Sequence, residues 1–273
     1  MEKIGAKVNA KINLSLCITG RKGAMHTLDS LMHSVSIFDT VIMSQKGFGV
    51  YMDGVLDTKN SLNKVLDMMK EYDLPKVRFD IEKGIPFSAG LGGSSADVAA
   101  AVELVRQAFG VDLPGAELGS DVPFMQKGGF ARVSGTGENV ESLSPLDMHL
   151  VIAKGKGGVS TKDGYNLFDK EESVSALDTK ALISALQNKD YKSAWKITRN
   201  DLQKPAFYLN SDVKRVYEDM CKCTPYTLMS GSGSAVFGVF EEKSDAQSAV
   251  DRLKDSVEFV TYATSEPFGV NLL

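Results

Sequence analysis

The feature that most constrains this chain is a glycine-rich loop at residues 86–93, between a predicted strand and a predicted helix. Residues 77–81 alternate apolar and polar side chains, which predicts a half-buried strand before the loop. After the loop, apolar residues recur every three or four positions, which predicts a helix that starts near Ser94 or Ser95 and ends at Gly110. This order brings the loop to the start of a helix.

A loop of this composition at the start of a helix is typical of an anion-binding site. Glycine lets backbone N–H groups turn toward a ligand, and the first helical turn adds unpaired donors and the positive end of the dipole. Phosphate is the expected ligand, although the loop matches neither the P-loop pattern nor the dinucleotide fingerprint. The alternative is a flexible connection whose serines only cap the helix.

Composition and charge narrow the class of protein. The 273 residues are 43% hydrophobic and 24% charged, which suits a large core in one big domain or two modest ones. With 35 acidic and 31 basic side chains, the net charge of −4 argues against a nucleic-acid or membrane partner. The three cysteines predict neither a disulfide framework nor a zinc site, and no apolar signal or membrane-spanning run occurs. We therefore expect a cytoplasmic enzyme or binding protein.

Two positions outside the loop have side chains suited to proton transfer or charge stabilisation. Residues 11–18 alternate, which predicts a strand that buries its apolar face and has Lys11 and Asn13 together on the other. Pro123 is typical of a first helical turn and places Asp121 at a helix N-terminus, where a carboxylate stays ionised. The alternatives are a solvated lysine on an edge strand and an aspartate that only caps its helix.

The second half of the chain mixes predicted helices and strands without strict alternation, and we place a domain boundary near residue 148. Between predicted strands at 226–229 and 235–240 lies the sequence Ser-Gly-Ser-Gly-Ser, residues 230–234. This stretch is too short for a linker, and taken alone it could equally be a flexible turn.

Several separated parts of the chain resemble the GHMP kinases, a family of small-molecule kinases. Residues 86–96 resemble the family's second motif, the loop that holds the phosphates of ATP, and residues 229–237 resemble its third motif. Residues 10–14 and 119–124 resemble the segments that carry the family's catalytic lysine and aspartate. These matches follow the family's order over the whole length of the chain.

The resemblance implies an α+β fold with two domains and an active site in the cleft between them. Residues 1–148 are expected to form the ATP-binding domain, which in the family has a left-handed crossover. Residues 149–273 are expected to form a ferredoxin-like domain. ATP and Mg²⁺ are the implied cofactors and a small molecule is the implied partner, while the metal ligands and the oligomeric state stay open.

The resemblance also implies the roles of individual residues. Asp121 is expected to be the catalytic base, with Lys11 orienting both Asp121 and the acceptor hydroxyl. The residues expected to bind ATP are Asn60, Lys83, Pro86, Ala89, Gly90, Leu91, Gly92, Gly93, Ser94 and Ser95. The residues expected to bind the acceptor are Asn13, His26, Tyr165, Gly231, Ser232 and Gly233.

Within the family, the chain most resembles the branch that phosphorylates a cytidine-diphosphate-linked polyol in non-mevalonate isoprenoid biosynthesis. His26 and Tyr165 are then expected beside the cytosine. The chain departs from that branch at Met25, where an aromatic residue is usual, and at residues 94–96 of the phosphate loop. The alternatives are a kinase for another small alcohol, such as mevalonate or homoserine, and a non-catalytic nucleotide-binding relative.

The third motif is expected to reach across the cleft to the phosphate loop. Glycine at 231 and 233 permits close approach, because a side chain would restrict φ and fill the gap. The sequence therefore predicts that Gly233→Val impairs catalysis while thermal stability changes little.

Overall fold

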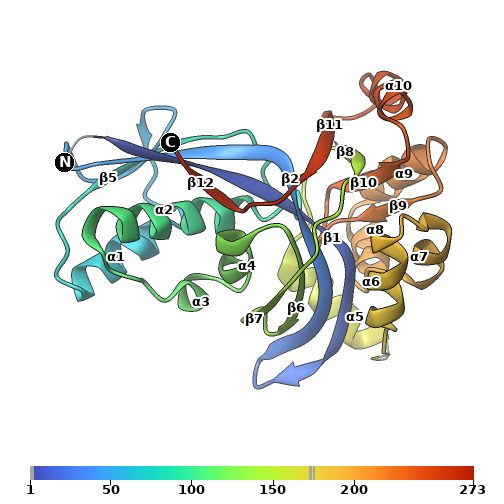
Figure 1. Ribbon diagram of the computed structural model, residues 1–273, viewed down its shortest axis with the longest axis horizontal. Helices are drawn as coiled ribbons and strands as arrows, with labels where there is room; N and C mark the ends of the chain where they lie inside the picture. Colours follow the sequence, from blue (N-terminus) through green and yellow to red (C-terminus); the bar gives the residue numbers. More distant parts are fainter. Residues whose placement is uncertain (1–2, 172–173, 175) are drawn as a thin grey trace.

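The structure is a computed structural model that describes residues 3–171, 174 and 176–273. Two lobes are built around one long hairpin, and both chain ends lie in the left-hand lobe of Figure 1. The hairpin consists of β1 (Ile4–Lys22) and β2 (Met25–Ser44), which pair antiparallel along their whole length with three irregularities in register. Because each strand spans both lobes, the hairpin fixes how the lobes sit relative to one another.

The first lobe is a sheet covered by helices. The strands that extend the hairpin in this lobe are β3 (Gly49–Met52), β4 (Val55–Leu56), β5 (Arg78–Glu82), β6 (Phe130–Gly135) and β7 (Asn139–Leu143). The helices are α1 (Asn63–Glu71), α2 (Gly93–Phe109), α3 (Gly115–Leu118) and α4 (Val122–Lys127). The strands β3 and β5 are parallel neighbours, and the chain passes between them through α1. The buried stripe of α2 packs in the main core, and the loop before α2 is bonded to β1 through the carbonyl of Leu91.

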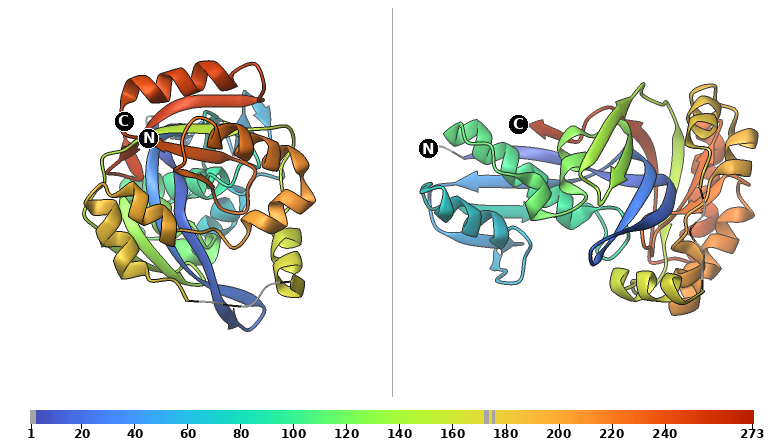
Figure 2. Two further views of the ribbon diagram at one scale, coloured as in Figure 1. Left: turned by 90° about the vertical axis from the view of Figure 1, so that its right-hand side faces the viewer. Right: turned by 90° about the horizontal axis from the view of Figure 1, so that it is seen from below.

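The second lobe is a four-stranded antiparallel sheet with helices against it (Figure 2). Its strands are β8 (His149–Lys154), β9 (Thr227–Met229), β10 (Val236–Phe240) and β11 (Phe259–Glu266). Its helices are α5 (Thr161–Glu171), α6 (Thr179–Gln187), α7 (Tyr191–Ile197), α8 (Gln203–Leu209), α9 (Ser211–Cys221) and α10 (Lys243–Leu253). The strand order β9-β10-β8-β11 is the order of a ferredoxin-like domain, as predicted from the family resemblance.

The two lobes share strands at their junction. The end of β11 pairs with β2 through Ser265 and Val35, and the last strand, β12 (Val270–Leu272), pairs with β1 in the first lobe. In turn, Leu16 of β1 packs in the core of the second lobe. The predicted α+β class is therefore confirmed, whereas the division of the chain at residue 148 stays a prediction.

Two local predictions differ from the structure. The helix α2 begins at Gly93, and its N-cap is Gly92 in a left-handed conformation with no side-chain cap, so Ser94 and Ser95 lie inside the first turn. The strand β1 is buried on both faces, because the loop before α2 and the loop between β9 and β10 pack against Lys11 through Gly92 and Gly231. No helix in the described part of the chain is long and apolar enough to cross a membrane.

Candidate active site

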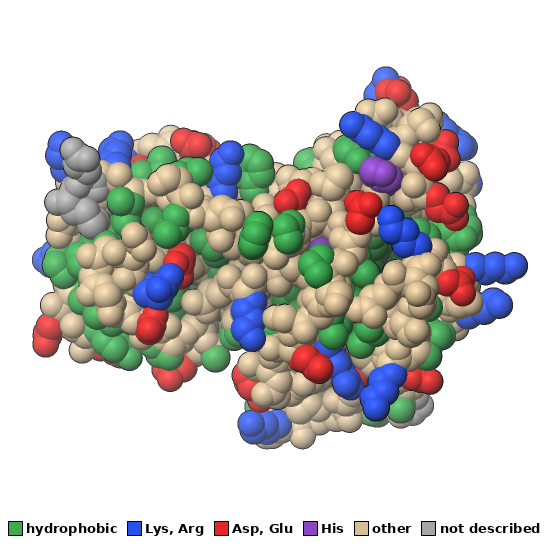
Figure 3. Space-filling model, viewed as in Figure 1, with side chains coloured by type: hydrophobic (Ala, Val, Ile, Leu, Met, Phe, Trp, Pro, Cys, Tyr) green, Lys and Arg blue, Asp and Glu red, His purple; other side chains and the backbone are tan. Residues whose placement is uncertain are grey.

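A cleft of about 550 Å³ lies where the phosphate loop of the first lobe meets the second lobe. Figure 3 shows one face of the molecule, on which charged side chains of both signs are mixed over both lobes. Of the predicted site residues, His26 does not line the cleft. Those that do are Lys11, Asn13, Asn60, Lys83, Pro86, Ala89, Gly90, Leu91, Gly92, Gly93, Ser94, Ser95, Asp121, Tyr165, Gly231, Ser232 and Gly233.

The phosphate loop lies directly on the strand that carries Lys11. The backbone N–H of Lys11 donates to the carbonyl of Leu91 over 3.0 Å. Gly92 has φ +77°, and a Cβ added there would lie 3.0 Å from Cε of Met125 and 3.1 Å from Cγ of Lys11. Glycine is therefore required at this position both for its φ and for the close approach.

Lys11 and Asp121 face each other at the floor of the cleft. Nζ of Lys11 lies 3.7 Å from Oδ2 of Asp121, and the lysine side chain is only 4% exposed. Burial lowers the pKa of Lys11, and the neighbouring Asp121 partly opposes this effect. Asp121 is the N-cap residue of α4, but its side chain makes no capping bond. The capping alternative is therefore wrong, and the carboxylate, which is 30% exposed, is free to face a substrate.

Asn13 is placed to orient Lys11. Its Oδ1 accepts from Nζ of Lys11 over 2.6 Å, and its Nδ2 donates to Oγ of Ser30 over 2.9 Å. Ser30 in turn donates to the carbonyl of Ser15. Since the side chain is fully buried and both of its ends have protein partners, Asn13 holds the lysine in one position.

The third motif forms the loop between β9 and β10 and packs on the phosphate loop. Oγ of Ser230 donates to the carbonyl of Gly90 over 3.0 Å, and the N–H of Ala235 donates to the carbonyl of Ala89 over 2.9 Å. Oγ of Ser234 donates to the carbonyl of Ser88 over 3.2 Å. The sequence prediction that these loops meet across the cleft is thus consistent with the geometry.

Asn200 holds this loop from the other side and was not identified from the sequence as a site residue. Its Nδ2 donates to the carbonyls of Met229 and Gly231, each over 2.8 Å, while its Oδ1 accepts from the N–H of Leu202. The contacts with Met229 and Gly231 join residues 29 and 31 positions apart, so no local sequence pattern predicts them, whereas the contact with Leu202 is local.

Lys83 is bound by two carboxylates that the sequence did not predict as site residues. Its Nζ donates to Oδ2 of Asp97 over 2.9 Å and to Oδ2 of Asp39. Oδ1 of Asp39 accepts the N–H groups of Gly84 and Ile85, each over 2.8 Å. Asp97 follows the phosphate loop in sequence and could have been noticed there, whereas Asp39 lies on β2 with no local signal.

His26 and Tyr165, the two residues expected beside a base, are in contact. Their rings stack with centroids 4.4 Å apart and planes 19° from parallel. Nε2 of His26 lies 2.8 Å from Oδ1 of Asp169, and this bond lowers the pKa of that aspartate. Burial, assisted by Asp121, raises the pKa of Tyr165 to about 12, so the phenol is neutral at physiological pH. Tyr165 lines the cleft and His26 supports it from behind.

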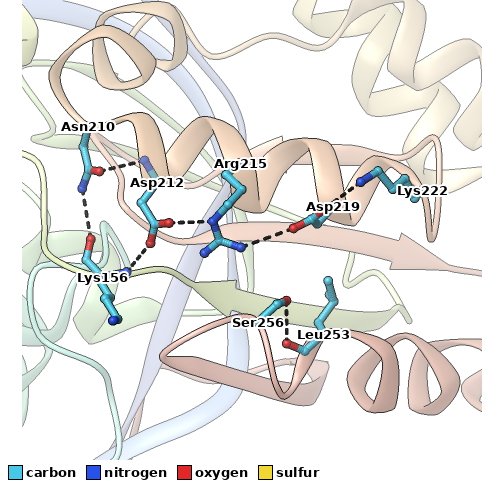
Figure 4. Close-up of polar contacts among 8 residues, drawn as sticks. All are labelled: Lys156, Asn210, Asp212, Arg215, Asp219, Lys222, Leu253 and Ser256. Carbon is cyan, nitrogen blue, oxygen red and sulfur yellow. Dashed lines mark hydrogen bonds and ion pairs between the residues drawn. The ribbon is translucent and has the colours of Figure 1, made fainter.

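A polar network fixes the segment 155–158 that leads into α5, the helix of Tyr165 (Figure 4). Asn210 caps α9 by accepting from the N–H of Asp212, and its Nδ2 donates to the carbonyl of Lys156 over 3.2 Å. Asp212 accepts from the N–H of Lys156 and from Nε of Arg215. The network therefore anchors one wall of the cleft to α9.

The described residues contain no group of three or more His, Cys, Asp or Glu side chains that could hold a metal ion. Mg²⁺ in phosphoryl-transfer sites is usually bound by substrate phosphates with only one or two carboxylates and several waters. We assign no protein ligand to a metal ion.

Two family models match this chain: "GHMP kinases N terminal domain" over residues 60–129 and "GHMP kinases C terminal" over residues 182–258. A 4-diphosphocytidyl-2-C-methyl-D-erythritol kinase of Clostridium botulinum (strain Eklund 17B / Type B) is 32% identical over 266 residues, covering 91% of this chain and 95% of the relative. The kinase of the same name from Desulfitobacterium hafniense (strain Y51) is 34% identical over 271 residues, covering 93% of each chain.

Solved structures agree with these relatives. A crystal structure of 4-(cytidine 5'-diphospho)-2C-methyl-D-erythritol kinase superposes with a TM-score of 0.80 and 27% identity, covering 96% of this chain and 98% of the other. A homoserine kinase from Cytophaga hutchinsonii superposes with a TM-score of 0.76 at 20% identity, covering 100% and 98%, which shows the shared fold. With both family models matched and relatives above 30% identity over nine-tenths of its length, this chain belongs to the GHMP kinase family.

Proposed function

We propose that this enzyme transfers a phosphoryl group from ATP to a hydroxyl of 4-diphosphocytidyl-2-C-methyl-D-erythritol, in non-mevalonate isoprenoid precursor biosynthesis. The observation that carries the proposal is the Lys11–Asp121 pair at the floor of a cleft between two glycine-rich loops. The choice of the acceptor molecule rests on the names of the relatives. The free thiols of the chain fit a reducing cytoplasm, where we expect the enzyme to act.

In this proposal Asp121 is the base. The acceptor hydroxyl gives its proton to the carboxylate of Asp121, its oxygen bonds to the γ-phosphorus of ATP, and the bond from that phosphorus to the bridging oxygen breaks to release ADP. Lys11 orients Asp121 and stabilises negative charge on the transferred group, and Asn13 fixes the position of Lys11. Because Lys11 is almost completely buried, its charge acts in a low-dielectric site where it is more effective than in water.

The nucleotide is placed with its phosphates on residues 90–95, where the positive end of α2 and the loop N–H groups meet the cleft. Mg²⁺ bound with the nucleotide would neutralise part of the phosphate charge. Asn60 also lines this cleft and accepts from the N–H of Leu62 through its Oδ1. Its Nδ2 donates to Asp57, so Asn60 shapes the nucleotide pocket from a fixed position.

The cytidine end of the acceptor is placed at Tyr165. The stacked rings of Tyr165 and His26 are too close for a base between them, so we expect the cytosine to pack on the side of Tyr165 that lines the cleft. Met25, which is 53% exposed, stands where the family usually has an aromatic residue. Because this aromatic contact with the base is missing, a smaller alcohol is the competing candidate for the acceptor.

Turnover of the cytidyl substrate, compared with mevalonate and homoserine at millimolar concentration, tests the proposal. Activity confined to the cytidyl substrate is expected. In Asp121→Asn, loss of the base should lower kcat by about 100-fold or more while ATP still binds. Activity only with a plain alcohol would refute the acceptor, turnover of Asp121→Asn within a few-fold of wild type would refute the base, and ATP binding without any product would indicate a non-catalytic relative.

A further inference from the structure

Beneath the phosphate loop, two buried carboxylates converge on one ammonium group. Asp39 is fully buried, the side chain of Asp97 is 4% exposed and that of Lys83 is 11% exposed. Both aspartates accept from Nζ of Lys83 through their Oδ2 atoms. If both were ionised, this buried cluster would carry one uncompensated negative charge.

The two aspartates differ in their other oxygen. Oδ1 of Asp39 accepts two backbone N–H groups at 2.8 Å, which stabilises the carboxylate form. Oδ1 of Asp97 is buried and has no hydrogen-bond partner among the residues that the structure describes. Burial, followed by the charge of Asp39, raises the pKa of Asp97 to about 8, although Lys83 opposes the shift. A proton that neutralises one of the two carboxylates is therefore bound by Asp97.

The cluster adjoins the place where polyphosphate is expected to bind. Asp97 lies one turn inside α2, and both Asp97 and Lys83 line the cleft with Gly93. A Cβ added to Gly93 would lie 3.4 Å from Nζ of Lys83, so this ammonium sits against the first residue of the helix. The charged groups near Asp97 on the elements that pack against α2 are Asp39 on β2 and Lys11 on β1. Lys11 is paired with Asp121 at the start of α4.

We propose that Asp97 is a positioning residue that keeps Lys83 at the start of α2 and must hold a proton for the polyphosphate of ATP to bind there. The proposal rests on the nucleotide site of the proposed function. A protonated Asp97 leaves the cluster neutral, because Asp39 and Lys83 then balance. An ionised Asp97 adds a negative charge close to the incoming phosphates, in a site with little solvent screening.

The direction of the pH effect follows from that proton. Below about pH 7 Asp97 is protonated in the free enzyme, so its titration leaves ATP affinity unchanged. As pH rises through about 8, the binding-competent form declines, and at pH 9 about one-tenth of it remains. The apparent Kd for ATP should then be about tenfold higher at pH 9 than at pH 7.

The test is calorimetric titration of a non-hydrolysable ATP analogue with Mg²⁺ between pH 6.5 and 9.5, on wild type and Asp97→Asn. Asparagine keeps an oxygen for Lys83 and cannot ionise. We expect similar Kd values near pH 7, and at pH 9 about tenfold tighter binding by Asp97→Asn than by wild type. Glu103→Gln is the matched control, because Glu103 lies on the same helix and pairs with Arg106 at its surface; it should keep the wild-type pH dependence.

Equal pH dependence in wild type and Asp97→Asn would overturn the proposal and assign the effect to Lys11 or the nucleotide. Carbon-13 NMR of the aspartate carboxyl groups in the free enzyme provides a second measurement that needs no nucleotide. A resonance that titrates near pH 8 and is missing in Asp97→Asn is expected, and an Asp97 resonance that titrates near pH 4 would also overturn the proposal. Failure of every protein to bind the analogue at any pH would instead refute the nucleotide site.

Discussion

The two glycine-rich loops that meet in the cleft both contain glycine and serine but use them differently. In the phosphate loop, Ser94 is exposed and Ser95 partly exposed at the start of a 17-residue helix. In the loop between β9 and β10, Ser230 and Ser234 are fully buried and donate to carbonyls of the phosphate loop. The first loop therefore presents donors to a ligand, whereas the second mainly holds the first in shape.

The largest effect is expected where the loops are closest, at Gly90. Its φ is +71°, and an added Cβ would lie 2.2 Å from the carbonyl oxygen of Ser230 and 2.9 Å from that of Gly233. Gly90→Ala must push the loops apart, so kcat/KM should fall by about 1,000-fold, equivalent to about 4 kcal/mol. Steady-state kinetics and thermal unfolding measure the change.

Gly110 provides a matched control for Gly90. It has nearly the same φ, +69°, but an added Cβ would meet no described atom within 4 Å. Gly110→Ala should therefore cost only the strain of a left-handed conformation, about 1–2 kcal/mol of stability, with normal kinetics. If Gly90→Ala behaved like Gly110→Ala, contact between the loops would not matter for catalysis.

A smaller effect is expected at Gly233, and here the structure corrects the expectation from sequence. An added Cβ would lie 2.9 Å from Sδ of the buried Met229, and φ is +89°. Gly233→Val should therefore lower stability by about 2–4 kcal/mol as well as kcat/KM by about 100-fold. Thermal unfolding distinguishes the expectation from structure from the expectation from sequence. A Tm of Gly233→Val equal to that of wild type would support the sequence expectation, in which this glycine only permits close approach to the substrate.

Sequence was sufficient where structure is local and insufficient where it depends on distant packing. The strand, phosphate loop and helix end at Gly110 were predictable because periodicity and glycine act over a few residues. The burial of Lys11 was not, because Gly92 and the distant Gly231 pack against its side chain only in the folded chain. In the sequence, Asp39 is an ordinary polar position on a strand. Its role depends on Lys83 and the loop before Ile85, which contact it only in the folded chain.

The smallest effects should separate support from binding within the second loop. Oγ of Ser230 is fully buried and bonded to Gly90, whereas Oγ of Ser232 bonds to Thr161 at the surface of the cleft. Ser230→Ala leaves the half-buried carbonyl of Gly90 without its donor, so the free energy of unfolding should fall by about 1–2 kcal/mol, with both KM values little changed. Ser232→Ala should change stability by less than about 0.5 kcal/mol and raise KM for the acceptor a few-fold without changing KM for ATP. The two variants should differ because, of these two serines, Ser232 is the one placed to face a ligand. If both variants changed only stability, or both changed only KM for the acceptor, the two serines would share one role and the contrast between the loops would be wrong.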